Sequence, residues 1–279
     1  MHVSVVSYSA ARRRPSLQRL AYYARVLRVL AGVDFKMKYA QSGMGYVWSL
    51  AKPLAYFGVL WLVFGRFFKV PGGTVDNFAL FLIIGLVVYL FFIDGVGLAL
   101  PSITSKGSLL RRLRFSPIVL PIAATVTALM TFAINSLAVV FFIVLSQTTP
   151  DLRWFLIAPL ALELYVFVVG SALIISTLFV QFRDIAQLWE LAAQLMIFLT
   201  PVMYPADVLP EWAQRVVFLN PLVQVMQDIR SIVLPGEQLT TAEVYGPLGY
   251  LAPLAIVALT VTAGVWLLWR SGPRFAERI

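Results

Sequence analysis

Six long apolar runs in the 279-residue chain restrict how it can fold. The hydrocarbon core of a bilayer needs about 20 mostly apolar residues from each spanning helix. The runs cover residues 48–68, 78–100, 118–145, 154–180, 185–203 and 248–269. The sequence therefore predicts an all-α integral membrane protein, in which residues 1–279 form a single transmembrane domain of six spanning helices.

The basic residues predict how these helices are oriented. The chain is 60% hydrophobic and 13% charged, yet its net charge is +9. Positively charged loops stay on the cytoplasmic side, and six crossings return both termini to one side. With the N-terminus in the cytoplasm, the cytoplasmic side holds residues 12–52, 106–114, 183 and 270–278, which contain most of the basic residues. We therefore expect a multi-pass protein of the cytoplasmic membrane with both termini in the cytoplasm, and no nucleic-acid partner.

Missing residue types exclude several kinds of chemistry. The chain has no cysteine and a single histidine, His2. Thiol nucleophiles, zinc centres built from Cys and His, and Ser-His-Asp triads are therefore excluded. The phosphate-binding pattern Gly-x-x-x-x-Gly-Lys-Ser/Thr does not occur either. We expect no catalytic residue, metal site or cofactor in this chain, so that any ATP would be bound by another.

Residues 17–33 precede the first run and have the pattern of a basic amphipathic helix. Arginines separate apolar residues that recur at helical spacing. These apolar residues are Leu17, Leu20, Ala24, Leu27 and Ala31. The pattern predicts a helix in the cytoplasmic interface, which either anchors the protein on anionic lipids or forms a gate beside a substrate entrance.

Residues 205–247, between the last two runs, are long for a loop. Leu222, Met226, Ile229 and Val233 share one helical face, and prolines bound the stretch. We expect two short helices here, residues 210–219 and 221–234. Either they are re-entrant helices that dip into the outer leaflet or cap the bundle, or they form a plain hairpin on the surface.

A strongly basic loop, residues 102–115, follows the second run and carries a ridge of leucines. The basic residues are Lys106, Arg111, Arg112 and Arg114, and the leucines are Leu109, Leu110 and Leu113. A short helix with such a ridge can dock in the groove of a partner protein. A loop that rests on the membrane surface would explain the basic residues alone.

The first and fifth runs each carry a stripe of side chains at helical spacing. The polar stripe of the fifth run consists of Gln187, Glu190 and Gln194, and it continues to Phe198. The aromatic stripe of the first run consists of Phe57, Trp61, Phe64 and Phe68. A polar stripe is typical of the wall of a hydrated path, and aromatic faces pack against the C–H faces of sugar rings. The alternative for the aromatic stripe is contact with lipid.

Ionisable residues inside spans are costly and need an explanation. Asp94 lies near the cytoplasmic end of the second run, where water reaches it. Glu163 lies on the outer half of the fourth run and Asn135 midway along the third. They either form a packing hydrogen bond or belong to a proton relay.

Residues 34–54, DFKMKYAQSGMGYVWSLAKPL, resemble the segment that leads into the first span of ABC-2 type permeases exporting O-antigens, capsules, teichoic acids and cell-wall galactans. Later landmarks agree in order with that family. They are LLRR at 109–112 with Phe115 and Leu120-Pro121, FRDI at 182–185, TPVMY at 200–204, and NPL at 220–222 followed by Arg230. Lys52 departs from the family, in which asparagine is usual at this position.

The resemblance covers nearly the whole chain and implies a permease similar to the bacterial Wzm/TarG group. Such a permease is a homodimer in the cytoplasmic membrane, with a channel for a lipid-linked polysaccharide between its subunits. A separate nucleotide-binding subunit would bind ATP and Mg and hydrolyse the ATP. A permease for a drug or another small lipid is the alternative.

The resemblance also implies roles for particular residues. Coupling to the ATPase would fall to Lys106, Leu109, Leu110, Arg111, Arg112, Leu113, Arg114 and Phe115. The channel would be lined by Phe57, Trp61, Phe64, Phe68, Gln187, Glu190, Gln194 and Phe198. Substrate would enter beside Arg25, Arg28, Lys36, Lys38, Tyr39, Tyr46 and Trp48, and residues 205–247 would form gating helices.

The double substitution Arg111→Glu/Arg112→Glu tests the coupling role. We expect it to abolish ATPase-driven transport, because the reversed charges prevent docking on the partner, and to leave membrane insertion unchanged when the chain is followed by cell fractionation. Retained transport would remove the docking role from this loop.

Overall fold

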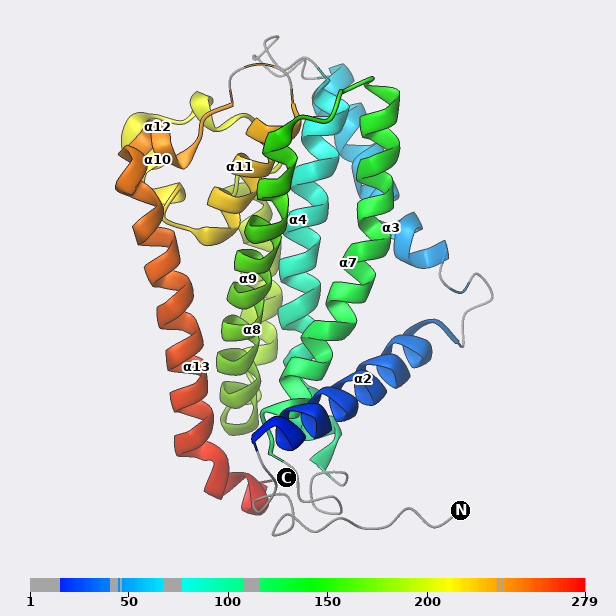
Figure 1. Ribbon diagram of the computed structural model, residues 1–279, viewed down its shortest axis with the longest axis vertical. Helices are drawn as coiled ribbons and strands as arrows, with labels where there is room; N and C mark the ends of the chain where they lie inside the picture. The colour runs from blue at the N-terminus through cyan, green and yellow to red at the C-terminus, as the bar shows by residue number, and fades with distance from the viewer. Residues whose placement is uncertain are drawn as a thin grey trace.

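The computed structural model describes residues 16–40, 45, 47–67, 77–107, 116–234, 236 and 238–278, with side chains from residue 22 to 38 and, from residue 45 on, as far as residue 272. These residues are all-helical, and no strand occurs among them. Most helices stand side by side as a bundle, and α2 (Ser16–Ala40) crosses its lower end obliquely (Figure 1). We call this the α2 end. The opposite end, the α11 end, holds α10 (Glu211–Val217), α11 (Pro221–Val233) and α12 (Thr241–Tyr245).

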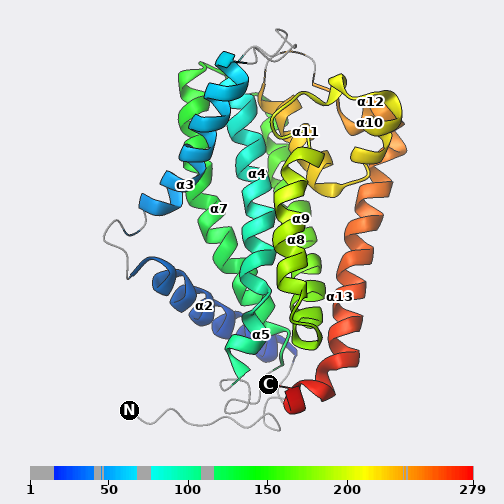
Figure 2. The same cartoon turned by 180° about the vertical axis from the view of Figure 1, so that it is seen from behind.

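Five helical segments of the described chain are long and apolar enough to cross a membrane. They are α3 (Val47–Leu60) with the π-helix η1 (Trp61–Phe67), α4 (Phe78–Ala99), α7 (Val119–Leu145), η2 (Leu152–Leu156) with α8 (Ile157–Gln181), and η4 (Pro247–Tyr250) with α13 (Leu251–Arg278). From α3 to α8 the direction alternates between the two ends (Figures 1 and 2). Five of the six apolar runs are thus confirmed as helices of spanning length.

The fifth run, residues 185–203, was predicted to be helical throughout, and this is wrong at its end. The helix α9 (Ile185–Leu199) has 15 residues and is shorter than a spanning helix. Pro201 explains where it ends, because a proline lacks an N–H and pushes the residue before it into an extended conformation. Thr200 accordingly has ψ 139°.

The central helix of the bundle is α4. Every residue from 80 to 92 is buried, because α3, α7, α8 and α11 all contact this helix. A helix that is apolar all round needs such enclosure. Aromatic rings fill two of the contacts: the centroids of Phe91 and Phe132 are 4.5 Å apart, and those of Phe92 and Phe167 are 5.1 Å apart.

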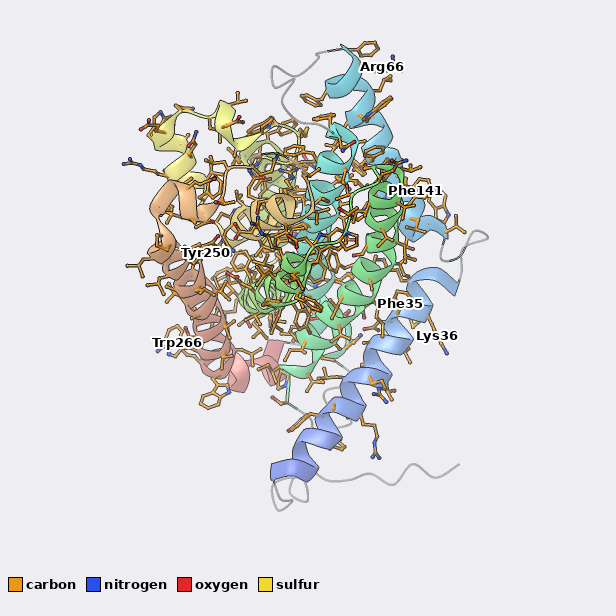
Figure 3. The ribbon with its side chains drawn as sticks, turned by 45° about the horizontal axis from the view of Figure 1, so that its top comes forward. Phe35, Lys36, Arg66, Phe141, Tyr250 and Trp266 are labelled. Atoms are coloured by element: carbon orange, nitrogen blue, oxygen red, sulfur yellow. The ribbon has the colours of Figure 1, made fainter. Side chains whose placement is uncertain are left out.

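Glycines allow α8 and α13 to approach closely. A Cβ atom on Gly170 would lie 2.8 Å from the backbone nitrogen of Val261, and one on Gly264 would lie 2.8 Å from Cβ of Leu173. Small residues at such crossings let helix backbones meet without the hydrophobic effect that drives packing in water. The long helix α13 is therefore held on α8 by shape, and its Trp266 points outward (Figure 3).

The helix α2 is longer than the predicted interface helix of residues 17–33, since it continues to Ala40. One face of α2 packs on Val119 and Leu120 of α7. That face is formed by Tyr23, Val26, Leu27 and Leu30. Ala24 was predicted to belong to the apolar face, but it is exposed. The packed face is rotated because apolar residues flank the predicted stripe on both sides, and contact with α7 selects among them.

The helix α11 is enclosed by the bundle. Asn220 caps it by accepting a hydrogen bond from the backbone nitrogen of Leu222 at 3.0 Å, and Pro221 occupies its first position. Residues 221–230 are all buried, and α11 contacts both α4 and α8. A plain surface hairpin, one of the two alternatives for this region, is therefore wrong for α11, although α10 exposes Trp212.

The polar face of α11 includes Arg230. This residue can be buried there because it donates hydrogen bonds to backbone carbonyl groups of two other segments. Its side chain is 0% exposed. Nε and Nη2 donate to the carbonyl oxygen of Phe81 at 3.1 and 3.0 Å. Nη1 donates to that of Pro201 at 2.6 Å, and Nη2 to that of Val202 at 2.8 Å. Arg230 thus satisfies carbonyl groups in the irregular segment after α9, where a buried backbone needs partners.

Replacement of Arg230 tests this role. Arg230→Gln should lower the free energy of unfolding by about 3 kcal/mol or more, because three buried carbonyl groups lose charged donors. Arg230→Lys should recover only part of the loss, since lysine lacks the planar fork of the guanidinium group. The measurement is the melting temperature of the purified protein in detergent. The matched control is Arg215→Gln on the exposed side of α10, and equal melting temperatures for the two glutamine variants would contradict the role of Arg230.

Candidate functional site

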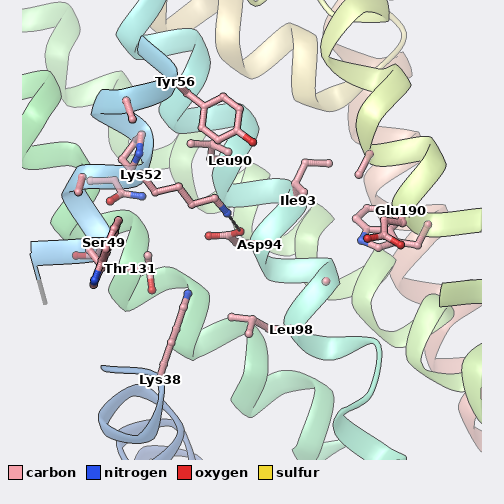
Figure 4. Close-up of a pocket in the computed structure, with 18 residues that line it drawn as sticks. Lys38, Ser49, Lys52, Tyr56, Leu90, Ile93, Asp94, Leu98, Thr131 and Glu190 are labelled. Atoms are coloured by element: carbon pink, nitrogen blue, oxygen red, sulfur yellow. Dashed lines mark ion pairs between the residues drawn. The ribbon is translucent and has the colours of Figure 1, made fainter. Parts of the chain in front are cut away.

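A cavity of about 820 Å³ opens toward the α2 end between α3, α4, α7 and α9 (Figure 4). The C-terminal part of α2 lies at one side of it. The wall from α7 includes Thr131 and Asn135, and α9 contributes Trp189, Glu190 and Ala193. A space of this size is typical of sites that bind small molecules or part of a larger ligand.

Charged side chains reach this cavity from four helices. Lys52 Nζ on α3 lies 3.6 Å from Asp94 Oδ1 on α4. Lys38 extends from α2 toward the cavity, and Glu190 lies across it on α9 (Figure 4). The Lys52 side chain is 54% exposed, so its ion pair adds little stability but leaves the ammonium group open to an anion.

The remaining wall is aromatic and aliphatic. Trp48, Tyr56 and Trp189 line the cavity together with Leu90 and Ile93. Ammonium groups beside aromatic and aliphatic surface suit an amphiphile that carries an anionic group, because each part of such a ligand finds a matching part of the wall.

The structure brings two of the predicted entrance residues to this cavity. Lys38 and Trp48 line it. Arg25, Arg28 and Lys36 are exposed elsewhere on α2, and Lys36 points away from the bundle (Figure 3). The side chain of Tyr39, and Tyr46 as a whole, lie outside the described residues.

The polar and aromatic stripes do not line this cavity together. The polar stripe residues Gln187, Glu190, Gln194 and Phe198 are exposed on α9, and of the four Glu190 lines the cavity. The described members of the aromatic stripe, Phe57, Trp61 and Phe64, are half-buried and pack against the core. Phe57 lies on Phe142 of α7 with ring centroids 4.7 Å apart, and the guanidinium carbon of Arg66 lies 5.5 Å from the Trp61 ring. Phe68 lies outside the described residues.

Of the eight predicted coupling residues, the structure describes Lys106. Lys106, which follows the short helix α5 (Ser102–Ser105), forms an ion pair with Asp34 of α2. Leu109, Leu110, Arg111, Arg112, Leu113, Arg114 and Phe115 lie outside the described residues. The ion pair connects the start of the basic loop to the helix that carries Lys38.

Sequence reasoning missed the pairing of Lys52 with Asp94. The sequence contained a signal for this pair. Consecutive spanning helices point in opposite directions, so Lys52 near the start of the first and Asp94 near the end of the second lie near the same end of the bundle. The hydrogen bond considered between Asn135 and Glu163 does not form. Asn135 lines the cavity at the α2 end, whereas Glu163 lines another, and Asn135 Oδ1 and Glu163 Oε1 are both without a hydrogen-bond partner.

Comparison with known proteins links this geometry to a family. Residues 25–234 match the family model described as ABC-2 type transporter. The chain is 28% identical over 218 residues to the O-antigen export system permease protein RfbA of Klebsiella pneumoniae, with 78% of this chain and 83% of the relative covered. It is 27% identical to the O-antigen export system permease protein RfbA of Myxococcus xanthus, and the alignment covers 94% of this chain and 98% of that relative. It is 24% identical to the capsule polysaccharide export inner-membrane protein CtrC of Neisseria meningitidis, covering 81% and 85%.

Charge reversal tests the link between Lys106 and Asp34, whose side chains are each 24% exposed. Asp34→Lys and Lys106→Asp should each lower the melting temperature, and the two together should restore most of it, with a coupling energy of about 1 kcal/mol. The same cycle on Asp151 and Arg153 is the control, because that pair is exposed at 63% and 74% and should show almost no coupling. Additive effects at Asp34 and Lys106 would show that the pair does not connect the two segments.

Proposed function

The chain belongs to the family of ABC-2 type transporters, and from that premise we propose that it is the membrane-spanning permease subunit of an exporter for a lipid-linked polysaccharide. Three relatives that align with 78%, 94% and 81% of its length are named as permeases or inner-membrane proteins for export of O-antigen or capsule polysaccharide. A permease for a drug or another small lipid is the alternative, and the experiment below separates the two.

The cavity at the α2 end is the observation that carries the proposal. A lipid-linked glycan presents a phosphate group, sugar rings and a hydrocarbon chain close together. Lys38 and Lys52 offer ammonium groups to the phosphate, while Trp48 and Trp189 offer ring faces to the sugars. The glycan would then slide over weak, repeated contacts, which suits continuous export better than tight binding.

The energy for export comes from a separate nucleotide-binding subunit, which binds ATP and Mg. We place its contact on residues 102–115. The ion pair of Lys106 with Asp34 supports this route, because movement of the loop would be passed to α2 and hence to Lys38 at the cavity. Rigid-body movement of packed helices is a common way to convert such a signal into opening of a path.

A homodimer would place the channel beside α9. Leu191, Leu195 and Phe198 are 54%, 52% and 66% exposed on this helix and lie on it with Gln187 and Gln194. Polar side chains on a spanning helix normally face protein or water instead of lipid. The exposed face of α9 therefore favours a second copy of the chain, with the polar stripes of the two copies along one hydrated path.

The α2 end faces the cytoplasm in this proposal. The beginning of α2 and the end of α13 lie together at that end (Figure 1), as an even number of crossings requires. The sixth crossing would consist of α9 and the buried segment after it, which holds Val202 and Met203. Irregular backbone is tolerated at membrane depth where protein satisfies it, and Arg230 does so here. In this arrangement α2 is an interface helix and α11 is re-entrant from the outer side.

Depletion of the chain in its own cells tests the function. A lipid-linked glycan should accumulate in the inner leaflet, where it can be extracted and identified. Cells that carry Gly97→Leu in place of the wild-type chain should export roughly tenfold less glycan, because the new side chain fills part of the cavity that Gly97 lines. Gly58→Leu is the matched control on α3, since no atom lies within 4 Å of a Cβ at that position.

Accumulation of a small lipid or a drug instead of a glycan would support the alternative permease. Full export by the Gly97→Leu chain, at a normal protein level, would remove the cavity from the transport path.

A further inference from the structure

A second cavity, of about 730 Å³, lies toward the α11 end between η2, α8, α11 and α13. It shares no lining residue with the cavity at the α2 end. Its charged lining residues are Arg153, Glu163 and Asp228. Because α8 and α11 are in contact, the carboxyl groups of Glu163 and Asp228 face one space.

The carboxyl group of Glu163 has a buried oxygen without a donor, whereas the carboxyl group of Asp228 has donors on both oxygens. Glu163 Oε1 and the neighbouring Gln224 Oε1 are buried without a hydrogen-bond partner. Asp228 accepts from Gln224 Nε2 at 2.7 Å and from the Tyr250 hydroxyl at 3.3 Å. Burial raises the pKa of the Asp228 carboxyl above its usual value. Buried acceptors without donors cost free energy, so this space favours a ligand with positive charge and several donors.

A primary ammonium group meets both needs, because it has one positive charge and three N–H donors. A metal ion suits the site less well. The described residues contain no group of three or more His, Cys, Asp or Glu side chains that could hold a metal ion.

The open side of this cavity is apolar. Leu156, Leu162 and Leu254 line it and are 54%, 61% and 46% exposed. They belong to segments of spanning length, so we expect lipid chains to contact them in a membrane. Arg153, with 74% of its side chain exposed, lies at the rim and can reach a phosphate group.

We propose that this cavity binds a membrane phospholipid with a primary-amine head group, such as phosphatidylethanolamine. The ammonium group donates to Glu163 and Asp228, the phosphate contacts Arg153, and an acyl chain lies along the exposed leucines. The bound lipid completes hydrogen bonds that the protein leaves open and connects α8, α11 and α13. This role does not depend on which substrate the permease exports.

Native mass spectrometry of the purified full-length chain in detergent tests the proposal. The probes are phosphatidylethanolamine, N-acetylated phosphatidylethanolamine and phosphatidylglycerol with identical acyl chains. We expect phosphatidylethanolamine to bind roughly tenfold more tightly than the other two, because they lack the ammonium group. Equal binding of the three lipids would overturn the proposal. The alternative is then that the two carboxyl groups share a proton and bind no ammonium group.

Variants place the binding in this cavity. Glu163→Gln keeps the shape of the side chain and should reduce the preference for phosphatidylethanolamine to less than roughly twofold, as should Asp228→Asn. The double variant Asp207→Asn/Glu211→Gln is the matched control, since both carboxyl groups are exposed at the same end outside the cavity. An unchanged preference in Glu163→Gln would overturn the proposal even if Asp228→Asn fails to fold.

Competition with a soluble head group tests whether the site recognises a whole lipid or a water-soluble amine. Glycerophosphoethanolamine in large excess should not displace the bound lipid, because it makes no contact with the exposed leucines. Displacement by this compound would show that the site recognises a water-soluble amine.

Discussion

The hydrogen bonds from Arg230 to the carbonyl oxygens of Phe81, Pro201 and Val202 join three segments that lie far apart in the sequence. Without them, the backbone after α9 would be buried with unsatisfied carbonyl groups, which is more costly in a membrane than in water. These bonds allow α9 to end at Leu199 while the chain continues inside the bundle. They also hold α11 against α4, and α11 supplies one wall of the cavity at the α11 end.

The two cavities use polar groups in opposite ways. At the α2 end, Lys52 pairs with Asp94 but stays exposed, and Lys38 and Glu190 also reach the cavity, so in the proposed function the two lysines meet the phosphate of an anionic amphiphile in transit. At the α11 end, the carboxyl groups of Glu163 and Asp228 line the cavity and Glu163 Oε1 has no hydrogen-bond partner, which suits a resident cation. If the loop that begins at Lys106 contacts the proposed nucleotide-binding subunit, its ion pair with Asp34 of α2 places the energy input beside the first cavity and away from the second. The proposed export path and the proposed lipid site are thus separate in both place and chemistry.

Much of the fold could be predicted from the sequence because hydropathy and length decide where a spanning helix forms. Five apolar runs became such helices, and the end of α9 could have been predicted from Thr200-Pro201. The burial of α11 could not, because Leu222, Met226, Ile229 and Val233 show the same spacing as a surface helix. Its polar face is buried only through contacts with distant segments. Lys38, Trp48 and Glu190 were singled out from the sequence and line the candidate site, and their roles in transport stay predictions. The pairing of Lys52 with Asp94 required the helices to be placed side by side.

In the proposed function, a lipid-linked glycan passes through the cavity at the α2 end. A photoreactive amino acid in place of Ala193, which lines that cavity, should form an adduct that carries carbohydrate when cells making the glycan are illuminated. The same amino acid in place of Leu254, which lines the other cavity, should form no glycan adduct. Carbohydrate at position 254 and none at position 193 would contradict the proposed path.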